Sequence, residues 1–184
     1  VLESVQPTRI ATLSDESSHP GQPIENGDAV IVATSGTTGR PKAVALTHSA
    51  VRASAIATSA RLGVTSTDKW LACLPPSHVG GLSVILRSIV TNTPVIAVPS
   101  FSVDFYNQAA KDGATLVSLV STALQRVDSS LFRTIVLGGA KPPADRPSNT
   151  VTTYGMTETG SGVVYDSIPL DGVEIEIRDS VIHL

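Results

Sequence analysis

The chain has 184 residues and a mass of 19.0 kDa, which suits one domain or one piece of a larger domain. A net charge of −3 gives no electrostatic reason to expect nucleic acid or an anionic membrane as a partner, and the sequence shows no long apolar span and no signal-peptide pattern. Hydrophobic residues make up 41% of the chain but aromatic residues only 4%, so the core must be built from Val, Ile, Leu and Ala. This composition predicts an α/β fold with a mostly parallel sheet covered by helices.

The first part of the chain combines a polar segment with two expected strands. Residues 1–27 are polar and rich in Ser, Pro and Glu, so we expect a partly ordered lead-in. The apolar run Ala29–Ala33 predicts a strand, and a second strand is expected at Ala43–Thr47. Between them the sequence reads Thr-Ser-Gly-Thr-Thr-Gly-Arg-Pro-Lys.

This connecting run has the residue types of a phosphate-binding loop. Its four hydroxyl side chains fall within five positions: Thr34, Ser35, Thr37 and Thr38. Gly36 and Gly39 let the backbone approach a ligand closely, and Lys42 adds a mobile cation. Backbone N–H groups, hydroxyls and an ammonium together form a cradle for a polyphosphate. The run matches neither the Walker loop nor the dinucleotide fingerprint, and its plainer alternative is an ordinary Ser/Thr/Gly-rich surface turn.

The middle of the chain alternates expected helices and strands. Ser49–Leu62 is Ala-rich and predicts a helix, with Thr47 or Ser49 as its N-cap. A strand at Leu71–Leu74 follows, in which Cys73 is expected to be buried packing rather than a nucleophile. A lone cysteine also permits no intrachain disulfide, which agrees with a reducing cytoplasm.

The segment after this strand carries the histidine His78 and the pair Gly80 and Gly81. Because Pro75 and its neighbouring proline disfavour helix, we expect His78 in a loop that precedes a helix from Leu82 to Val90. His78 is a candidate for gating a substrate pocket or for binding a substrate carboxylate. The alternative is a structural histidine whose hydrogen bonds are satisfied within the protein.

The later elements are shorter. The sequence predicts, in order, a strand at Pro94–Val98, a helix at Asp104–Asp112 that ends before Gly113, a strand at Leu116–Val120, a helix at Ala123–Val127 and a strand at Thr134–Leu137. The last strand runs into the tight turn Gly138-Gly139-Ala140. Alternating residues at Glu174–Arg178 predict a strand with one exposed face.

A second candidate site lies in the run Val-Thr-Thr-Tyr-Gly-Met-Thr-Glu-Thr-Gly, which ends at Gly160. Tyr154 offers a flat face for a purine, and Thr157 offers a hydroxyl for a phosphate oxygen. Glu158 supplies a hard oxygen ligand for Mg²⁺. The alternative for Glu158 alone is a solvated surface carboxylate.

Together, these ordered motifs resemble the adenylate-forming superfamily, which contains acyl-CoA synthetases, peptide-synthetase adenylation domains and luciferases. The resemblance implies the α/β fold of the N-terminal domain of that superfamily, in incomplete form. It divides the chain into the lead-in 1–27 and the core of an ATP-binding domain over 28–184, and it implies that the C-terminal lid domain is absent from this chain.

The resemblance also implies roles for individual residues. Lys42, Thr157 and Glu158 correspond to catalytic groups, with Glu158 as the Mg²⁺ ligand, and His78, Gly80 and Gly81 lie beside the acyl substrate. The residues implied in ATP binding are Thr34, Ser35, Gly36, Thr37, Thr38, Gly39, Lys42, Gly138, Gly139, Ala140, Thr153, Tyr154, Gly155, Met156 and Thr157.

Within the superfamily, the texture of residues 26–178 looks like the compact o-succinylbenzoate–CoA ligases of actinobacterial type, which act in menaquinone biosynthesis. This implies a cytoplasmic, AMP-forming ligase that uses ATP, Mg²⁺ and coenzyme A, in a fold whose members often form homo-oligomers. Because the lid domain is missing, we expect the 184 residues alone to be weakly active or inactive. The alternatives are another acid–CoA ligase, an amino-acid-activating domain, or a non-catalytic nucleotide-binding fragment.

Overall fold

The computed structural model describes residues 9–11, 16–18, 25–34, 42–179 and 181–183. Its helices are α2 (His48–Arg61), α3 (Val79–Thr91), α4 (Val103–Lys111) and α5 (Ser121–Leu124), with 3₁₀ turns η1 (Ser129–Leu131) and η2 (Thr157–Thr159). Its strands are β1 (Arg9–Ala11), β2 (Glu16–Ser18), β3 (Asp28–Thr34), β4 (Lys42–Thr47), β5 (Trp70–Ala72), β6 (Val95–Ala97), β7 (Leu116–Leu119), β8 (Thr134–Leu137), β9 (Thr150–Gly155), β10 (Gly162–Tyr165), β11 (Ile168–Pro169), β12 (Glu176–Arg178) and β13 (Val181–His183).

A mixed sheet of seven strands forms the centre of the molecule, in the order β11-β10-β9-β8-β7-β5-β6. The five strands from β9 to β6 run parallel, whereas β10 and β11 pair antiparallel at one edge. The prediction of an α/β fold with a mostly parallel sheet is therefore confirmed. Strand β9 is the one large element that the sequence reading treated as a motif and not as a strand.

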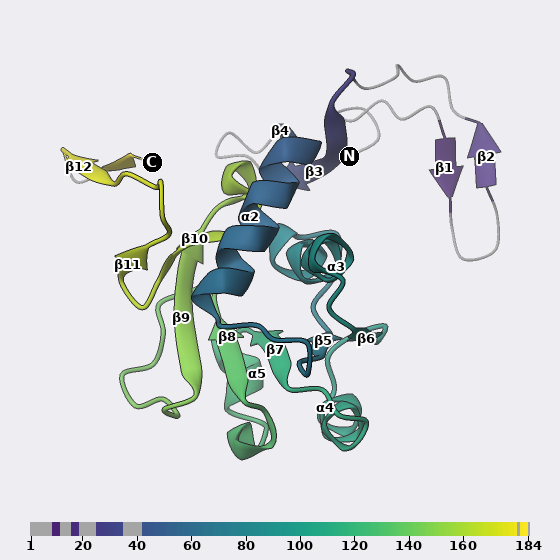
Figure 1. The fold of residues 1–184 in the computed structure, drawn as a ribbon, viewed down its shortest axis with the longest axis vertical. Helices are drawn as coiled ribbons and strands as arrows, with labels where there is room; N and C mark the ends of the chain where they lie inside the picture. The colour runs from purple at the N-terminus through teal and green to yellow at the C-terminus, as the bar shows by residue number, and fades with distance from the viewer. Residues whose placement is uncertain (1–8, 12–15, 19–24, 35–41, 180, 184) are drawn as a thin grey trace.

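Helices cover both faces of the sheet, so the core has two halves (Figure 1). On one face, Trp70 of β5 and Leu116 of β7 pack with Val84 of α3. On the other face, Leu71 and Val117, their direct neighbours in sequence, pack with residues of α4 and α5. Successive strand residues point to opposite faces, which is why short unbroken apolar runs serve both halves.

Capping residues in the sequence predicted the start of α2 and the end of α4. Thr47 caps α2, because its Oγ1 accepts a hydrogen bond of 3.1 Å from the backbone N–H of Ala50. Gly113 follows α4 with a φ of +85°, as expected for a C-terminal glycine. Cys73 is buried, and burial raises the pKa of its thiol to about 11, so its role as packing is confirmed.

Three expectations about elements were wrong. The helix expected at Ala123–Val127 lies earlier in the chain, at Ser121–Leu124. Helix α3 begins at Val79 and not at Leu82, so Gly80 and Gly81 lie in its first turn. The expected half-buried strand at Glu174–Arg178 is the shorter β12, whose three residues are all exposed, because among the described residues it pairs only with the short, equally exposed β13. Its alternating pattern is therefore not a sign of a buried face here.

Three two-stranded sheets lie outside the central sheet. Strands β1 and β2 pair antiparallel, as do β3 with β4 and β12 with β13. Of the lead-in 1–27, the structure describes only β1, β2 and residues 25–27. No helix in the described part of the chain is long and apolar enough to cross a membrane.

An ion pair between a buried aspartate and a partly exposed arginine joins the ends of the central strands. The carboxylate of Asp68, which is 3% exposed, accepts hydrogen bonds from Arg133 Nη2 at 2.8 Å and from Thr115 Oγ1 at 2.7 Å. Burial alone would raise the pKa of Asp68, but the hydrogen bonds from Arg133, the Thr65 backbone and Thr115 lower that pKa to about 2. Asp68 therefore links the loop before β5 to the starts of β7 and β8.

This depressed pKa makes the stability of the fold sensitive to acid. The carboxylate stabilises the folded state fully above its unfolded pKa of about 4, and this contribution disappears as the pH falls from about 4 to about 2. Asp68→Asn is expected to lower the free energy of unfolding by about 2 kcal/mol at pH 7 and to flatten its pH dependence between pH 2 and 4. Urea unfolding across pH 2–7 measures the free energy of unfolding and its pH dependence, and Asp171→Asn, at an exposed position, is the control. An equal loss of stability in acid for Asp68→Asn and the parent protein would contradict the role of Asp68.

Candidate functional site

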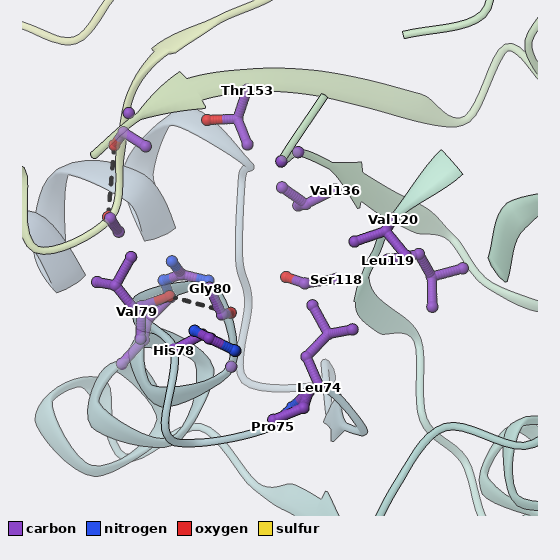
Figure 2. A pocket seen from close by; sticks show the side chains of 18 of the residues that line it. Leu74, Pro75, His78, Val79, Gly80, Ser118, Leu119, Val120, Val136 and Thr153 are labelled. Carbon is purple, nitrogen blue, oxygen red and sulfur yellow. Dashed lines mark hydrogen bonds between the residues drawn. The ribbon is translucent and has the colours of Figure 1, made fainter. Parts of the chain in front are cut away.

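A cavity of about 320 Å³ opens between the carboxyl ends of the parallel strands and the first turns of α3. Leu74, Val120 and Val136 supply apolar walls, while Ser118 and Thr153 supply hydroxyls. Figure 2 shows these side chains converging on a common space from several elements. Clefts at the carboxyl ends of strands are the usual ligand sites of open α/β sheets, and a mostly apolar wall with a few polar groups is typical of them.

The glycines of α3 shape one wall of this cavity. A Cβ on Gly81 would collide with the backbone oxygens of Leu74 and Pro75, so only glycine lets the first turn of α3 lie directly on the preceding loop. His78 is the exposed residue that precedes the helix and lines the cavity, together with Gly80 and Gly81. The structure thus brings the three predicted substrate residues together. Their roles stay predictions.

An arginine that the sequence reading missed also lines the cavity. Arg87 of α3 is only 3% exposed, and its Nε and Nη1 atoms have no hydrogen-bond partner among the described residues. Burial lowers the pKa of its guanidinium, but the pKa of an arginine starts so high that the group keeps its charge. In the described part of the chain, the ion pairs join Asp68 to Arg133, Asp166 to Arg146 and Glu176 to Arg178, so none neutralises Arg87.

A second cavity, of about 510 Å³, adjoins the first. It is lined by the turn Gly139–Pro142 and by the end of β9, including Tyr154. Gly139, Thr153 and Gly155 border both cavities, so a ligand in one can reach a ligand in the other. Thr153 lies where they meet, because Gly162 and Gly138 have no Cβ to crowd its side chain.

The predicted metal-binding block forms a tight turn beside these cavities. Glu158 lies exposed in the middle of η2, with Thr157 before it. The Oγ1 atom of Thr159 accepts a 3.1 Å hydrogen bond from the backbone N–H of Met156, and Gly160 ends the turn with a φ of +73°. The turn thus holds the Glu158 backbone while leaving its carboxylate accessible. Among the described residues, no cluster of three or more His, Cys, Asp or Glu side chains could hold a metal by itself.

The predicted phosphate loop lies largely outside the described residues. Ser35, Gly36, Thr37, Thr38 and Gly39 belong to the segment 35–41, whereas Thr34 and Lys42 flank it as directly paired residues of β3 and β4. Strand β4 contacts η2, and Leu46 of β4 lies next to Gly160. The Glu158 turn therefore packs beside β4, the strand that follows the loop, near the strand's far end.

Polar contacts fix the helix after this loop onto the strand after the turn. Ser54 Oγ of α2 lies 2.5 Å from Ser161 Oγ, and Thr58 Oγ1 lies 3.1 Å from the buried hydroxyl of Tyr165 in β10. One turn further on, Arg61 Nη2 donates a 2.7 Å hydrogen bond to the Pro169 carbonyl. These three contacts lie on one face of α2. They hold the helix that follows the predicted phosphate loop against the segment that follows the Glu158 turn.

A model of the AMP-binding enzyme family matches residues 3–180. The chain belongs to this family. A member of known name, the 2-succinylbenzoate–CoA ligase of Bacillus anthracis (strain A0248), is 40% identical over 149 residues, which cover 72% of this chain and 31% of that protein. The chain thus spans about a third of the length of the curated relatives that it matches.

Solved structures of family members agree with the fold. The o-succinylbenzoate coenzyme A synthetase from Bacillus subtilis in complex with ATP and magnesium ion matches with a TM-score of 0.74 and 30% identity, over 91% of this chain and 42% of that chain. The same synthetase with the acyl-adenylate intermediate OSB-AMP matches with a TM-score of 0.76 and 29% identity, over 92% of this chain and 41% of that chain. These matches confirm the predicted superfamily and its N-terminal-domain fold.

Sequence reasoning missed two functional candidates in the first cavity, Arg87 and Ser118. Arg87 is the only charged residue in the otherwise apolar and small α3, and this signal was available in the sequence. Ser118 falls in the apolar strand β7 and is the one residue of that strand that is not fully buried. Side chains of a strand alternate between the two faces of the sheet, but which face Ser118 takes is known only when the elements packed on each face are known.

Proposed function

We propose that this chain forms the substrate- and ATP-binding core, over residues 28–184, of an AMP-forming o-succinylbenzoate–CoA ligase of menaquinone biosynthesis. The observation that carries the proposal is the pair of adjoining cavities: a mostly apolar one that holds an arginine with no ion-pair partner among the described residues, and a second one beside Tyr154. The relatives named as 2-succinylbenzoate–CoA ligases support it.

The adenylation step requires two ligands to meet. A carboxylate oxygen of the acid attacks the α-phosphorus of ATP, the bond to the β-phosphate breaks, and pyrophosphate leaves. We place the acid in the first cavity and adenine against Gly138–Ala140 and Tyr154, so that the reacting atoms meet near Thr153. Catalysis here consists mainly of positioning and of neutralising charge.

The charged groups of this chain suit the leaving phosphates. We assign the β- and γ-phosphates to the loop from Thr34 to Lys42 and the α-phosphate to Thr157, with Gly155 and Met156 lining its approach. Glu158 offers the single carboxylate that Mg²⁺ usually takes from a protein when phosphates supply further ligands. The ion would neutralise charge on the phosphates as pyrophosphate departs. In the second step the thiol of coenzyme A loses its proton, attacks the acyl carbon and displaces AMP.

Arg87 favours an acid that has a second carboxylate. A buried cation without a counterion is costly unless a ligand neutralises it, and a guanidinium matches a carboxylate in a bidentate way. The apolar walls suit an aromatic or aliphatic body between the two acid groups. o-Succinylbenzoate has this composition: a benzene ring, one carboxylate to activate and a second one to anchor.

The test is ATP-dependent pyrophosphate release with o-succinylbenzoate, benzoate and a panel of amino acids. Release with o-succinylbenzoate alone is the expected result. Release with another acid at equal or higher efficiency would overturn the assigned substrate and favour a different acid–CoA ligase or an amino-acid-activating domain. If no acid gives release, ATP binding in the presence of Mg²⁺ measures whether this chain is a nucleotide-binding fragment only, which would overturn its catalytic assignment.

A further inference from the structure

A tryptophan lies directly behind the unpaired arginine. The Cζ atom of Arg87 lies over the ring of Trp70, 4.9 Å from the ring centroid. Trp70 is fully buried in β5, where it pairs with Val95 of β6 on one side and with Leu116 of β7 on the other. It does not line the substrate cavity, so it can act on a ligand only through Arg87.

Nothing else described in the structure fixes the guanidinium. Arginines are normally oriented by hydrogen bonds, but Nε and Nη1 of Arg87 have none among the described residues. A second cavity that borders Arg87 measures about 10 Å³, which is room for a single water at most. The 320 Å³ cavity, which Arg87 also lines, has room for an anion that reaches the guanidinium.

An indole ring suits this position for a chemical reason. Its face attracts a cation, most strongly where water is excluded, yet it accepts no conventional hydrogen bond and carries no negative charge. A carboxylate in the same place would neutralise Arg87 and compete with a ligand. Trp70 holds the guanidinium and leaves its N–H groups available.

We propose that Trp70 is a positioning residue for substrate selectivity: its ring holds Arg87 in place as an uncompensated cation that receives the second carboxylate of a dicarboxylic acid. The inference rests on the proposed function, because it assumes that the acid occupies the cavity that Arg87 lines. It assigns to β5, an element outside the pocket wall, part of the discrimination between dicarboxylic and monocarboxylic acids.

The experiment compares the dissociation constants of o-succinylbenzoate and benzoate by calorimetry in the parent protein and in two variants. Trp70→Leu removes the ring face, and Trp70→Phe keeps a weaker one. Trp70→Leu is expected to weaken o-succinylbenzoate binding about tenfold and to leave benzoate binding within about twofold, with Trp70→Phe between. Loss of general packing would instead weaken both acids alike.

A matched control uses the second arginine–aromatic pair of the described structure. Arg126 lies over the ring of Phe101, 5.5 Å from its centroid, and neither residue lines the cavity. Phe101→Leu is therefore expected to leave the ratio of the two dissociation constants unchanged. Trp70 is also the only tryptophan of the chain, so its fluorescence in the parent protein reports whether an acid reaches Arg87.

The outcomes separate the two proposals. If the parent protein binds both acids equally and its fluorescence does not respond to o-succinylbenzoate, the second-carboxylate site and the proposed substrate are overturned. If the parent protein discriminates and Trp70→Phe and Trp70→Leu discriminate equally well, the role of Trp70 is overturned while the proposed function stands. If Trp70→Leu does not fold, Trp70→Phe decides: an unchanged ratio of dissociation constants in that variant contradicts the inference.

Discussion

Replacing Arg87 with methionine is expected to weaken o-succinylbenzoate binding about 100-fold while leaving the folded protein as stable as before, or more stable. The binding loss follows because the second carboxylate of the acid would enter the cavity without a counterion. The gain in stability follows because methionine fills a similar space without burying an unpaired charge. Weaker acid binding together with unchanged or higher stability therefore distinguishes an anion-binding arginine from a structural one.

Calorimetric titration with the acid and urea unfolding measure the two parts of this result. The matched control is Arg126→Met, which removes an arginine that also lies over an aromatic ring but does not line the cavity. That variant is expected to bind the acid as the parent protein does. A large loss of stability in Arg87→Met would mean that Arg87 is a structural residue and that the cavity has no built-in anion site.

Replacing Glu158 with glutamine is expected to slow acyl-adenylate formation about 100-fold at low Mg²⁺ concentration and to raise the Mg²⁺ concentration needed for half-maximal rate. Glutamine keeps the shape of the side chain but lacks the charge that attracts a hard divalent cation. The turn that carries residue 158 is held by Thr159 and ends at Gly160, so its backbone is expected to be unaffected.

Isotopic exchange between ATP and pyrophosphate across a range of Mg²⁺ concentrations measures this effect in the full-length protein. ATP binding without Mg²⁺ is expected to remain the same as in the parent, because the phosphates are assigned to other groups. Glu174→Gln, which changes an exposed carboxylate outside η2, serves as the control. An unchanged Mg²⁺ requirement in Glu158→Gln would make Glu158 a solvated surface residue.

Local sequence signals predicted the elements of this fold well where they depend on neighbours in the chain. The cap of α2 at Thr47, the glycine after α4 and the strand Thr134–Leu137 all follow from side chains within a few positions. The start of α3 did not, because helix propensity disfavours Gly80 and Gly81. Only the backbone of Leu74 and Pro75, against which Gly81 packs, explains why the first turn of this helix contains glycine.

The sequence by itself determined the family of this protein, because the family motifs depend on residue types in a fixed order along the chain. For the candidate ATP site, the same motifs give a prediction of its chemistry. What only the tertiary structure decided is how the first cavity, where we place the acid, and the side chain behind it are assembled. Trp70, Arg87 and Thr153 come from a central strand, a covering helix and a third strand. Their meeting depends on the parallel order of the sheet and on which face each side chain takes. Neither can be read from local spacing, since long-range contacts between elements set both.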